Sequence, residues 1–215
     1  MRTGRMTESQ KNAYDNLFAA YGLRIADGVF NTAEVFNNQN PTVLEIGFGM
    51  GDSLIEMAQA APQQNFIGIE VHTPGVGRLM HQIESEGLSN LKAYSEDAVE
   101  VIDQCIIDNS LNKVQVFFPD PWHKKKHNKR RIIQPEFVQK LRSKLELGGV
   151  LHLATDWENY AEQMMDVMTA AEGFKNLQGE GNFSERPSFR PVTKFERRGQ
   201  RLGHGVWDLL FEKVS

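Results

Sequence analysis

The sequence predicts an α/β fold in which a doubly wound, mostly parallel sheet ends in an antiparallel C-terminal strand. Three observations carry this prediction. Short runs such as TVLEI and NFIGI are mostly apolar and do not alternate with polar residues, as expected for strands that are buried on both faces. Helical segments separate these runs along the chain. A glycine-rich turn, GFGMG, directly follows the first run and opens a helix.

The N-terminal segment, residues 1–40, is expected to be helical. Thr7-Glu8-Ser9-Gln10 has the T-x-x-Q pattern of a capping box, which predicts a helix from this point to about Ala20. The next elements follow from the alternation of apolar runs with helical periods. They are a strand over 41–46, a helix with Asp52 and Ser53 in its first turn, a strand over 65–71, a helix over 74–86 ended by Gly87, a strand over 91–95 and a helix over 97–107.

The second half of the chain continues the alternation as far as about Phe174. Its expected elements are a strand over 114–118, a helix over 135–145 closed by Leu147-Gly148-Gly149, a strand over 150–155 and a helix over 157–171. A polar loop rich in Arg, Pro and Gly follows over 179–203, and the apolar run 205–214 predicts the final strand. Ligands of such sheets bind beyond the carboxyl ends of the strands, so candidate site residues are sought there.

The composition limits the classes of function that the chain can have. The chain has 215 residues, 40% of them hydrophobic, which suits a single domain over 1–215. Lys and Arg number 24 against 28 Asp and Glu, so a nucleic-acid partner would require positive charge gathered on one face. The lone Cys105 cannot form an internal disulfide; it reads either as a small buried residue or as a catalytic thiol. With no membrane-length apolar run, these features predict a cytoplasmic protein.

The glycine turn holds Gly47, Gly49 and Gly51, whose lack of Cβ lets backbone N–H groups approach a ligand. The spacing is G-x-G-x-G rather than the dinucleotide pattern G-x-G-x-x-G. Glu45, two residues before the first glycine, would repel a pyrophosphate but would suit an ammonium group. The turn alone is also compatible with a tight strand–helix junction.

Two further acids follow the next two strands of the predicted sheet. Glu70 ends the second strand, where an acid can accept from both ribose hydroxyls, and Asp97 follows the third, where an adenine would lie. Each has a simpler alternative: Glu70 as a solvated strand end, and Asp97 as the N-cap of the next helix. Glu45 is harder to explain structurally, because it lies inside an apolar strand. Together with the glycines, the three acids predict an S-adenosylmethionine site, with S-adenosylhomocysteine as product.

The stretch FFPDPWHKKKHNKRR, residues 117–131, follows the fourth strand. Pro119 fixes its own φ and Pro121 restricts Asp120 to extended geometry, so the Asp120 carboxylate is preorganised. At the same sheet edge as the cofactor, it could accept from the N–H groups of guanine, orient the base and offset the positive charge that forms when the ring nitrogen N7 is methylated. The alternative is a surface turn. Trp122 is expected either to stack on the base or to pack on the sheet edge.

Two basic clusters suggest a folded polyanion as partner. The first interleaves histidines with Lys and Arg, and the second lies in the late loop. The first comprises His123, Lys124, Lys125, Lys126, His127, Lys129, Arg130 and Arg131; the second comprises Arg186, Arg190, Lys194, Arg197, Arg198 and Arg201. The alternative for each is a solvated face.

The blocks VLEIGFGMG, GIEVHTPGVG, FFPDPWHKKKHNKRR, ATDWENYAE and RPVTKFERRG…LGHGVWDL resemble the bacterial tRNA (guanine-N7-)-methyltransferases, from about residue 41 to 212. The resemblance implies a class I, Rossmann-like methyltransferase fold with a seven-stranded sheet, with residues 41–173 as cofactor-binding core and 174–215 as substrate loop and C-terminal strand. It implies methylation of N7 of the guanosine at position 46 in the tRNA variable loop. One departure is that family members usually carry further residues, often basic, before the segment matching GRMTESQ.

The resemblance also implies roles for individual residues. The residues that would contact the cofactor are Glu45, Glu70, Asp97 and Asp120, and Asp120 would also lie at the catalytic position. Those that would contact the substrate are Lys124, Asp156, Thr193, Lys194, Phe195 and Glu196. Those that would contact RNA are Lys126, His127, Lys129, Arg130 and Arg131. Asp156 could otherwise be a helix N-cap, and Glu196 a charge in a loop. No metal and no obligate protein partner are expected, and a monomer is favoured over a homodimer.

Two other functions stay open from the sequence. The Pro-Asp-Pro-Trp motif is loosely similar to the Asp-Pro-Pro-aromatic motif of amino-methyltransferases, which methylate an exocyclic amine, although its second proline is absent. A non-catalytic RNA-binding protein on the same fold is the third possibility, against which Glu45, Glu70 and Asp120 argue.

Overall fold

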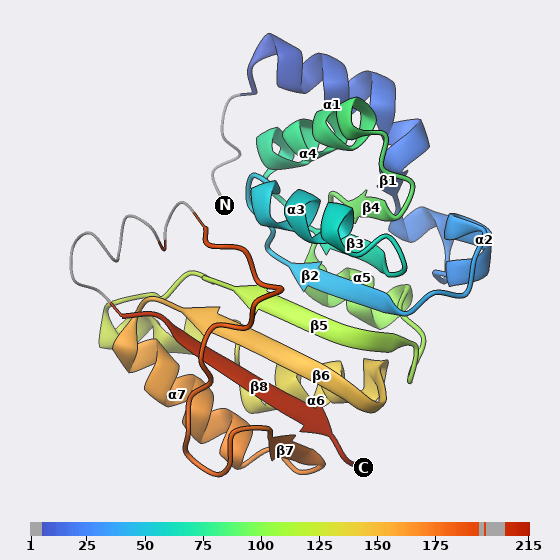
Figure 1. Ribbon diagram of the computed structural model, residues 1–215. Helices are drawn as coiled ribbons and strands as arrows, with labels where there is room; N and C mark the ends of the chain where they lie inside the picture. The colour runs from blue at the N-terminus through green and yellow to red at the C-terminus, as the bar shows by residue number, and fades with distance from the viewer. Residues whose placement is uncertain (1–5, 194–195, 197–204) are drawn as a thin grey trace. The chain divides into compact units, whose positions relative to one another are not determined.

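The computed structural model describes residues 6–193, 196 and 205–215 of the chain (Figure 1). The chain divides into two units, Met1–Ile107 and Asp108–Ser215, so the boundary between them falls inside the expected segment 41–173. Within the described part of the chain, no helix is long and apolar enough to cross a membrane.

The first unit contains four parallel strands in the order β1-β4-β3-β2. The strands are β1 (Gly22–Leu23), β2 (Thr42–Ile46), β3 (Asn65–Ile69) and β4 (Leu91–Tyr94). The helices are α1 (Glu8–Tyr21), η1 (Ile25–Asp27), α2 (Thr32–Phe36), α3 (Asp52–Ala60), α4 (Thr73–Glu86) and α5 (Ala98–Gln104). Every residue of β2 and β3 is buried, which confirms the prediction made from their mostly apolar sequences.

Local sequence signals set the helix ends of this unit. Thr7 and Gln10 form the expected capping box at the start of α1. Gly87 ends α4 with φ +64°, a left-handed conformation that favours glycine. Helices α1 and α4 pack closely: a Cβ on Gly77 of α4 would lie 2.4 Å from the carbonyl oxygen of Gln10.

The second unit has strand order β5-β6-β8-β7, in which β5 and β6 are parallel and β8 runs antiparallel to both β6 and β7 (Figure 1). Its strands are β5 (Leu111–Phe117), β6 (Leu145–Thr155), β7 (Phe174–Asn176) and β8 (Trp207–Lys213). Its helices are η2 (Lys125–Arg130), α6 (Pro135–Lys144) and α7 (Glu158–Thr169). The predicted antiparallel C-terminal strand is therefore confirmed.

Three details differ from the expectations. The described residues form eight strands, four in each unit, whereas the resemblance implies seven; the short strands β1 and β7 are additional to the six that the residue patterns predict. Helix α5 stops at Gln104, short of the expected 107. Helix α6 ends at Lys144 rather than at Leu147-Gly148-Gly149, because β6 begins at Leu145, which pairs with Leu111. A Cβ on Gly149 would lie 2.9 to 3.2 Å from the carbonyl oxygens of Glu146, Leu111 and Asn112. Gly149 is therefore needed for close backbone packing in an irregular part of β6, and it does not cap a helix.

Candidate active site

The glycine loop of the first unit leaves the end of β2 and leads into α3. Gly47, Gly49 and Gly51 have φ values of +77°, +61° and +81°, so all three occupy the left-handed region that favours glycine. A Cβ on Gly47 or Gly49 would meet nothing within 4 Å. The need for glycine at these two positions is therefore conformational, and the loop's backbone borders open space into which a ligand can fit.

The Glu70 side chain holds the glycine loop through hydrogen bonds to backbone N–H groups. One carboxylate oxygen, Oε2, accepts from the backbone N–H of Gly49 at 2.9 Å, and Oε1 accepts from the N–H of His72 at 2.9 Å. The side chain is half-buried, so the alternative of a solvated strand end is wrong. Because each carboxylate oxygen can accept more than one hydrogen bond, Glu70 keeps capacity for ligand hydroxyls.

Glu45 and Asp97 complete the acidic set of the first unit. Glu45 is 2% exposed within β2, where it pairs in register with Gly68 of β3. Asp97 is exposed and caps α5: its Oδ1 accepts from the N–H groups of Val99 at 2.9 Å and Glu100 at 3.4 Å. The N-cap alternative for Asp97 is therefore confirmed, while its contact with an adenine stays a prediction.

Gly75 is a site-supporting residue that the sequence reasoning missed. A Cβ at this position would lie 1.9 Å from the carbonyl oxygen of Gly49, so the first turn of α4 supports the glycine loop at close range. The available signal was a glycine inside the first turn of a helix, directly after Pro74, where glycine costs roughly 1 kcal/mol relative to alanine.

The donor set of the first unit fits S-adenosylmethionine. Acidic side chains lie in and beside a loop whose backbone is open to a ligand, so an ammonium group and ribose hydroxyls are suited and a pyrophosphate is not. Within the described residues, no group of three His, Cys, Asp or Glu side chains could hold a metal ion.

A strained turn follows β5 in the second unit. Phe118 and Trp122 have φ values of +51° and +44°, on either side of Pro119-Asp120-Pro121. Such conformations cost on the order of 1–3 kcal/mol each for non-glycine residues and persist only where neighbouring contacts hold them. The Phe118 N–H donates to the carbonyl oxygen of Ala154 on β6 at 2.8 Å. The Asp120 side chain is exposed at the centre of this turn.

The basic segment forms the 3₁₀ helix η2, and its cations are of two kinds. Those on the exposed side are Lys124, Lys125, Lys126, Lys129 and Arg130. Arg131, by contrast, is 2% exposed. The expectation that Arg131 contacts RNA is corrected, because its guanidinium binds protein carbonyl and amide oxygens instead of facing solvent.

Trp122 contacts two residues of the basic segment, and packing of its ring on the sheet edge stays a prediction. Its ring lies edge-on to His127, with 6.0 Å between centroids, and the guanidinium carbon of Arg130 is 5.1 Å from its centre. His127 is half-buried by this contact. A cation held over an indole face is a favourable pair that also fixes the orientation of the ring. Stacking of Trp122 on a base stays a prediction.

Asp156 follows β6 and is half-exposed. The N-cap of α7 is Trp157, whose N–H donates to the Thr155 hydroxyl at 3.2 Å. The alternative of Asp156 as the helix N-cap is therefore wrong, and its carboxylate remains available. His123 contacts the same segment edge-on, with 4.2 Å between its ring centroid and that of Trp157.

The late loop is anchored by a buried ionic network. Arg190, Glu196 and Asp208 are 0%, 1% and 1% exposed. The Arg190 guanidinium donates two hydrogen bonds to Glu196, at 2.7 and 3.1 Å, and two to Asp208, at 2.7 and 2.8 Å. Burial opposes the charged form of Arg190, but the hydrogen bonds to Glu196 and Asp208 raise its pKa above the ordinary value. The expectation that Arg190 contacts a polyanion is therefore corrected.

Other residues of the late loop meet this network. Thr193 accepts from the N–H of Glu196 through its hydroxyl at 3.1 Å. Substrate contacts of Thr193 and Glu196 stay predictions, and Lys194, Phe195, Arg197, Arg198 and Arg201 lie outside the described residues. His152 shares Asp208 at 2.7 Å, and burial lowers its pKa although Asp208 opposes that shift.

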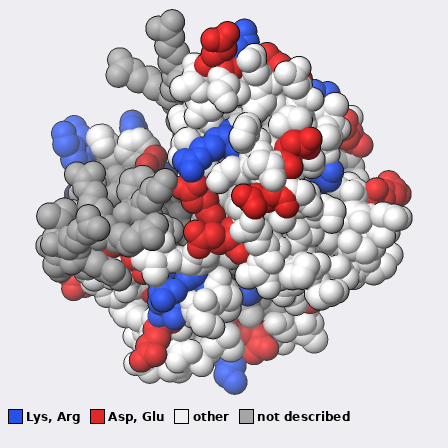
Figure 2. Space-filling model, turned by 45° about the horizontal axis from the view of Figure 1, so that its top comes forward, with Lys and Arg blue, Asp and Glu red and all other residues white. Residues whose placement is uncertain are grey.

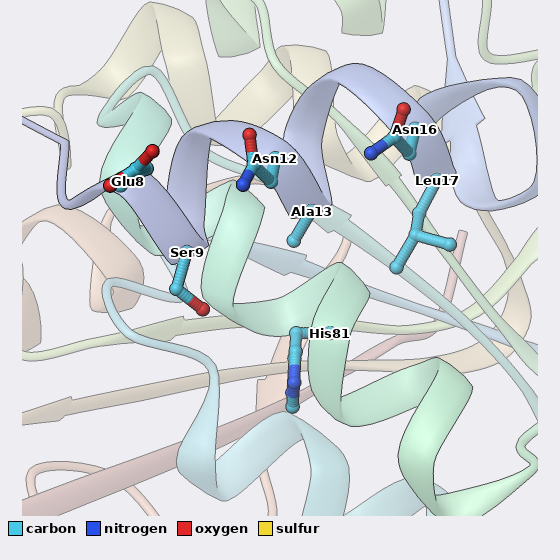
Figure 3. Close-up of a pocket in the computed structure, with 7 residues that line it drawn as sticks. All are labelled: Glu8, Ser9, Asn12, Ala13, Asn16, Leu17 and His81. Carbon is cyan, nitrogen blue, oxygen red and sulfur yellow. The ribbon is translucent and has the colours of Figure 1, made fainter.

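The surface carries charge of both signs. On the face shown in Figure 2, Lys and Arg side chains are interspersed with Asp and Glu, in keeping with the net charge of −4. A shallow pocket on the first unit lies between α1 and α4 (Figure 3). Its lining residues are Glu8, Ser9, Asn12, Ala13, Asn16, Leu17 and His81, none of which is a predicted site residue.

Comparison with known proteins identifies the family. A family model described as "Putative methyltransferase" matches residues 39–209. A tRNA (guanine-N(7)-)-methyltransferase of Saccharophagus degradans is 61% identical over 99% of this chain and 93% of that protein, and one of Alcanivorax borkumensis is 62% identical over 99% and 89%. The chain belongs to the tRNA (guanine-N7-)-methyltransferase family. The resemblance found in the sequence blocks is thereby confirmed.

A solved structure supports the fold of this methyltransferase. The 16S rRNA methyltransferase KamB matches with a TM-score of 0.60 at 14% identity, over 100% of this chain and 97% of that one. At so low an identity the match shows the fold alone. It confirms the predicted α/β, Rossmann-like methyltransferase architecture.

Proposed function

We propose that this protein transfers a methyl group from S-adenosylmethionine to N7 of the guanine at position 46 in the variable loop of tRNA. The observation that carries the proposal is identity of 61–62% along nearly the whole chain to proteins named tRNA (guanine-N(7)-)-methyltransferase. The glycine loop and its acids, and the rigid carboxylate of the second unit, are the chemical groups that this reaction requires.

The first unit holds the methyl donor in this proposal. S-adenosylmethionine, when bound, supplies an electrophilic methyl group on a sulfonium centre. Glu45 attracts the ammonium group of its methionine part, the backbone of Gly47 and Gly49 admits it closely, and Glu70 accepts from its ribose hydroxyls. Asp97 contacts the cofactor near its adenine ring.

Asp120 orients the base. N7 of guanine has a free lone pair, so the reaction needs no side chain to remove a proton from the attacking atom. The base acquires positive charge as it reacts. A carboxylate that accepts from the N–H groups on the opposite edge of guanine both fixes the ring and offsets that charge. The strained turn keeps Asp120 fixed before the substrate arrives, which lowers the cost of alignment.

The tRNA is held by the exposed cations of the basic segment, Lys124 to Lys126, Lys129 and Arg130. Asp156, which follows β6, and Thr193, which lies within the late loop, contact the substrate. Phosphate contacts of this kind position a nucleic acid without reading its sequence.

The decisive experiment is transfer of labelled methyl from S-adenosylmethionine to an unmodified tRNA transcript, compared with a transcript in which guanosine 46 is replaced by adenosine. Label in 7-methylguanosine on the first transcript and none on the second is the expected result. N6-methyladenosine without 7-methylguanosine would instead indicate the amine-methylating alternative. An absence of S-adenosylmethionine binding in calorimetry would favour a non-catalytic RNA-binding protein.

The same assay tests Asp120. Asp120→Ala is expected to lower kcat by about 100- to 1000-fold, the usual cost of removing one electrostatic stabiliser, while tRNA affinity changes less than about twofold. Asp166→Asn, an exposed substitution on α7, is the control and should leave kcat unchanged. A kcat for Asp120→Ala equal to that of the control would remove Asp120 from the proposed chemistry.

A further inference from the structure

The turn that carries Asp120 has a backbone which its own sequence does not favour. Phe118 and Trp122 both take left-handed φ values, and neither is a glycine. The prolines stiffen the centre of the turn but have no N–H to donate, so they can bind their surroundings only through their carbonyl oxygens. The turn's geometry therefore depends on contacts made by residues outside it.

Arg131 supplies one such contact. Its Nε donates to the carbonyl oxygen of Pro121 at 2.8 Å. On the other side of the turn, the Phe118 N–H donates to Ala154 of β6 at 2.8 Å. The two hydrogen bonds hold Phe118, two residues before Asp120, and Pro121, directly after it.

The rest of the Arg131 guanidinium is bound to α7. Nη2 donates to Asn159 Oδ1 at 3.0 Å, and Nη1 donates to Gln163 Oε1 at 2.5 Å. The guanidinium carbon lies 4.6 Å from the ring centre of Tyr160, whose hydroxyl accepts from the Ile133 N–H at 3.2 Å. Arg131 is thus clamped by three residues of one helix while its Nε reaches the turn.

This arrangement needs arginine rather than any cation. The guanidinium is a rigid planar fork, so its Nε and Nη groups can serve the turn and the helix at the same time. A lysine ammonium is a single point charge and can reach only one of them well. Burial lowers the pKa of Arg131, so its charge is costly here and is retained for these hydrogen bonds rather than for a solvent-facing role.

We propose that Arg131 is a positioning residue for methyl transfer: it ties the Asp120 turn to α7 through the Pro121 carbonyl and thereby fixes the Asp120 carboxylate. Helix α7 begins at Glu158, two residues after Asp156, so Arg131 connects the segments that carry Asp120 and Asp156. This inference rests on the proposed function, because it assigns Arg131 to the alignment of the base that Asp120 holds.

The test compares Arg131→Lys and Asn159→Ala with the wild-type protein in the tRNA methylation assay. A misplacement of about 1 Å at a catalytic group costs on the order of 100-fold, so Arg131→Lys should lower kcat by about 10- to 100-fold. Asn159→Ala removes a clamp partner on an exposed residue and should lower kcat by about three- to tenfold. For both variants, the dissociation constant for tRNA and its salt dependence should stay within about twofold of wild type.

Lys129→Gln is the matched control for a surface contact. It should weaken tRNA binding and reduce the slope of log affinity against log salt by about 0.7 to 0.9, the value for one lost phosphate contact. If Arg131→Lys instead follows this pattern, with a reduced salt slope and an unchanged kcat, Arg131 contacts RNA and the positioning role is overturned.

Hydrogen exchange separates this inference from the proposed function. In Arg131→Lys the Phe118 amide, which donates to the Ala154 carbonyl oxygen, should exchange about tenfold faster than in wild type, whatever reaction the protein catalyses. Unchanged exchange at this amide would overturn the clamp. A wild-type protein that forms no 7-methylguanosine would refute the proposed function, while the exchange result would still show whether Arg131 holds the turn.

Discussion

Replacement of Arg190 by methionine tests the buried network that anchors the late loop. Arg190 is fully buried and donates four hydrogen bonds to Glu196 and Asp208, each of which is 1% exposed. Methionine fills most of the same volume but carries no charge. The Arg190→Met variant therefore leaves two neighbouring carboxylates buried without their cation. A buried charge without its partner strongly destabilises the folded state.

The expected magnitude follows from that geometry. Removal of one partner from a buried pair costs about 3–5 kcal/mol, because the remaining charge is uncompensated. For a protein of this length, each kcal/mol lowers Tm by about 2–4 °C, so Arg190→Met should unfold about 6–20 °C below wild type.

Urea titration and thermal melting measure this deficit. Arg186→Met is the control, since Arg186 is exposed and its Nε lies 4.0 Å from Glu196 Oε1. An exposed pair contributes at most about 1 kcal/mol. The double variant Arg190→Met/Asp208→Asn should recover more than about 1 kcal/mol of the loss, as expected for groups coupled in one network. A cost for Arg190→Met no larger than that for Arg186→Met would refute the reasoning.

Three further outcomes are expected. Burial lowers the pKa of His152, whose ring faces the charged groups Asp208, Arg190 and Lys113, so the unfolded state binds a proton more readily than the folded state. The free energy of unfolding should therefore fall as pH drops through about 6.5, by at most about 1.4 kcal/mol per pH unit. Thermal melts over a pH series should show that His152→Gln flattens this dependence. Gly75→Ala should weaken S-adenosylmethionine binding in calorimetry because its Cβ meets the Gly49 carbonyl, whereas Gly77→Ala, which overpacks α4 against α1, should cost about 1–3 kcal/mol of stability with unchanged affinity. Charge reversal at Lys124 to Lys126 should raise the tRNA dissociation constant and flatten its salt dependence in filter-binding assays; an unchanged slope would make this segment a solvated face.

The strand–helix alternation could be predicted because it rests on local patterns. The mostly apolar sequences of β2 and β3 indicate buried strands without knowledge of their neighbours, and the capping box at Thr7 is complete within four residues. The start of β6 could not be predicted in the same way. Leu145 leaves the helix because it pairs with Leu111, which is distant in sequence, and Gly148-Gly149 resembles a helix stop only when that pairing is unknown.

The roles of the arginines were the least predictable part of the site. Arg131 and Arg190 lie in segments so rich in basic residues that each was assigned to a polyanion surface. Their partners are far away in sequence: Asn159 and Gln163 for Arg131, and Asp208 for Arg190. A run of basic residues shows where positive charge lies in the sequence, but it does not show which side chains are buried. Burial decides whether an arginine can bind RNA or instead stabilises the fold.

The removal of Arg131 from the RNA surface changes what the basic segment can contribute. Its five exposed cations, Lys124 to Lys126, Lys129 and Arg130, allow a salt slope no steeper than roughly −4.5 from this segment, at about −0.9 per phosphate. Such contacts are blind to sequence, so they bring many tRNAs to the protein without selecting a base. In the proposed function, selection of guanine then depends on the Asp120 turn, whose strained backbone is held from one side by Ala154 and from the other by Arg131. An enzyme of this design loses discrimination and turnover together when the turn loosens, and loses only affinity when the surface cations are removed.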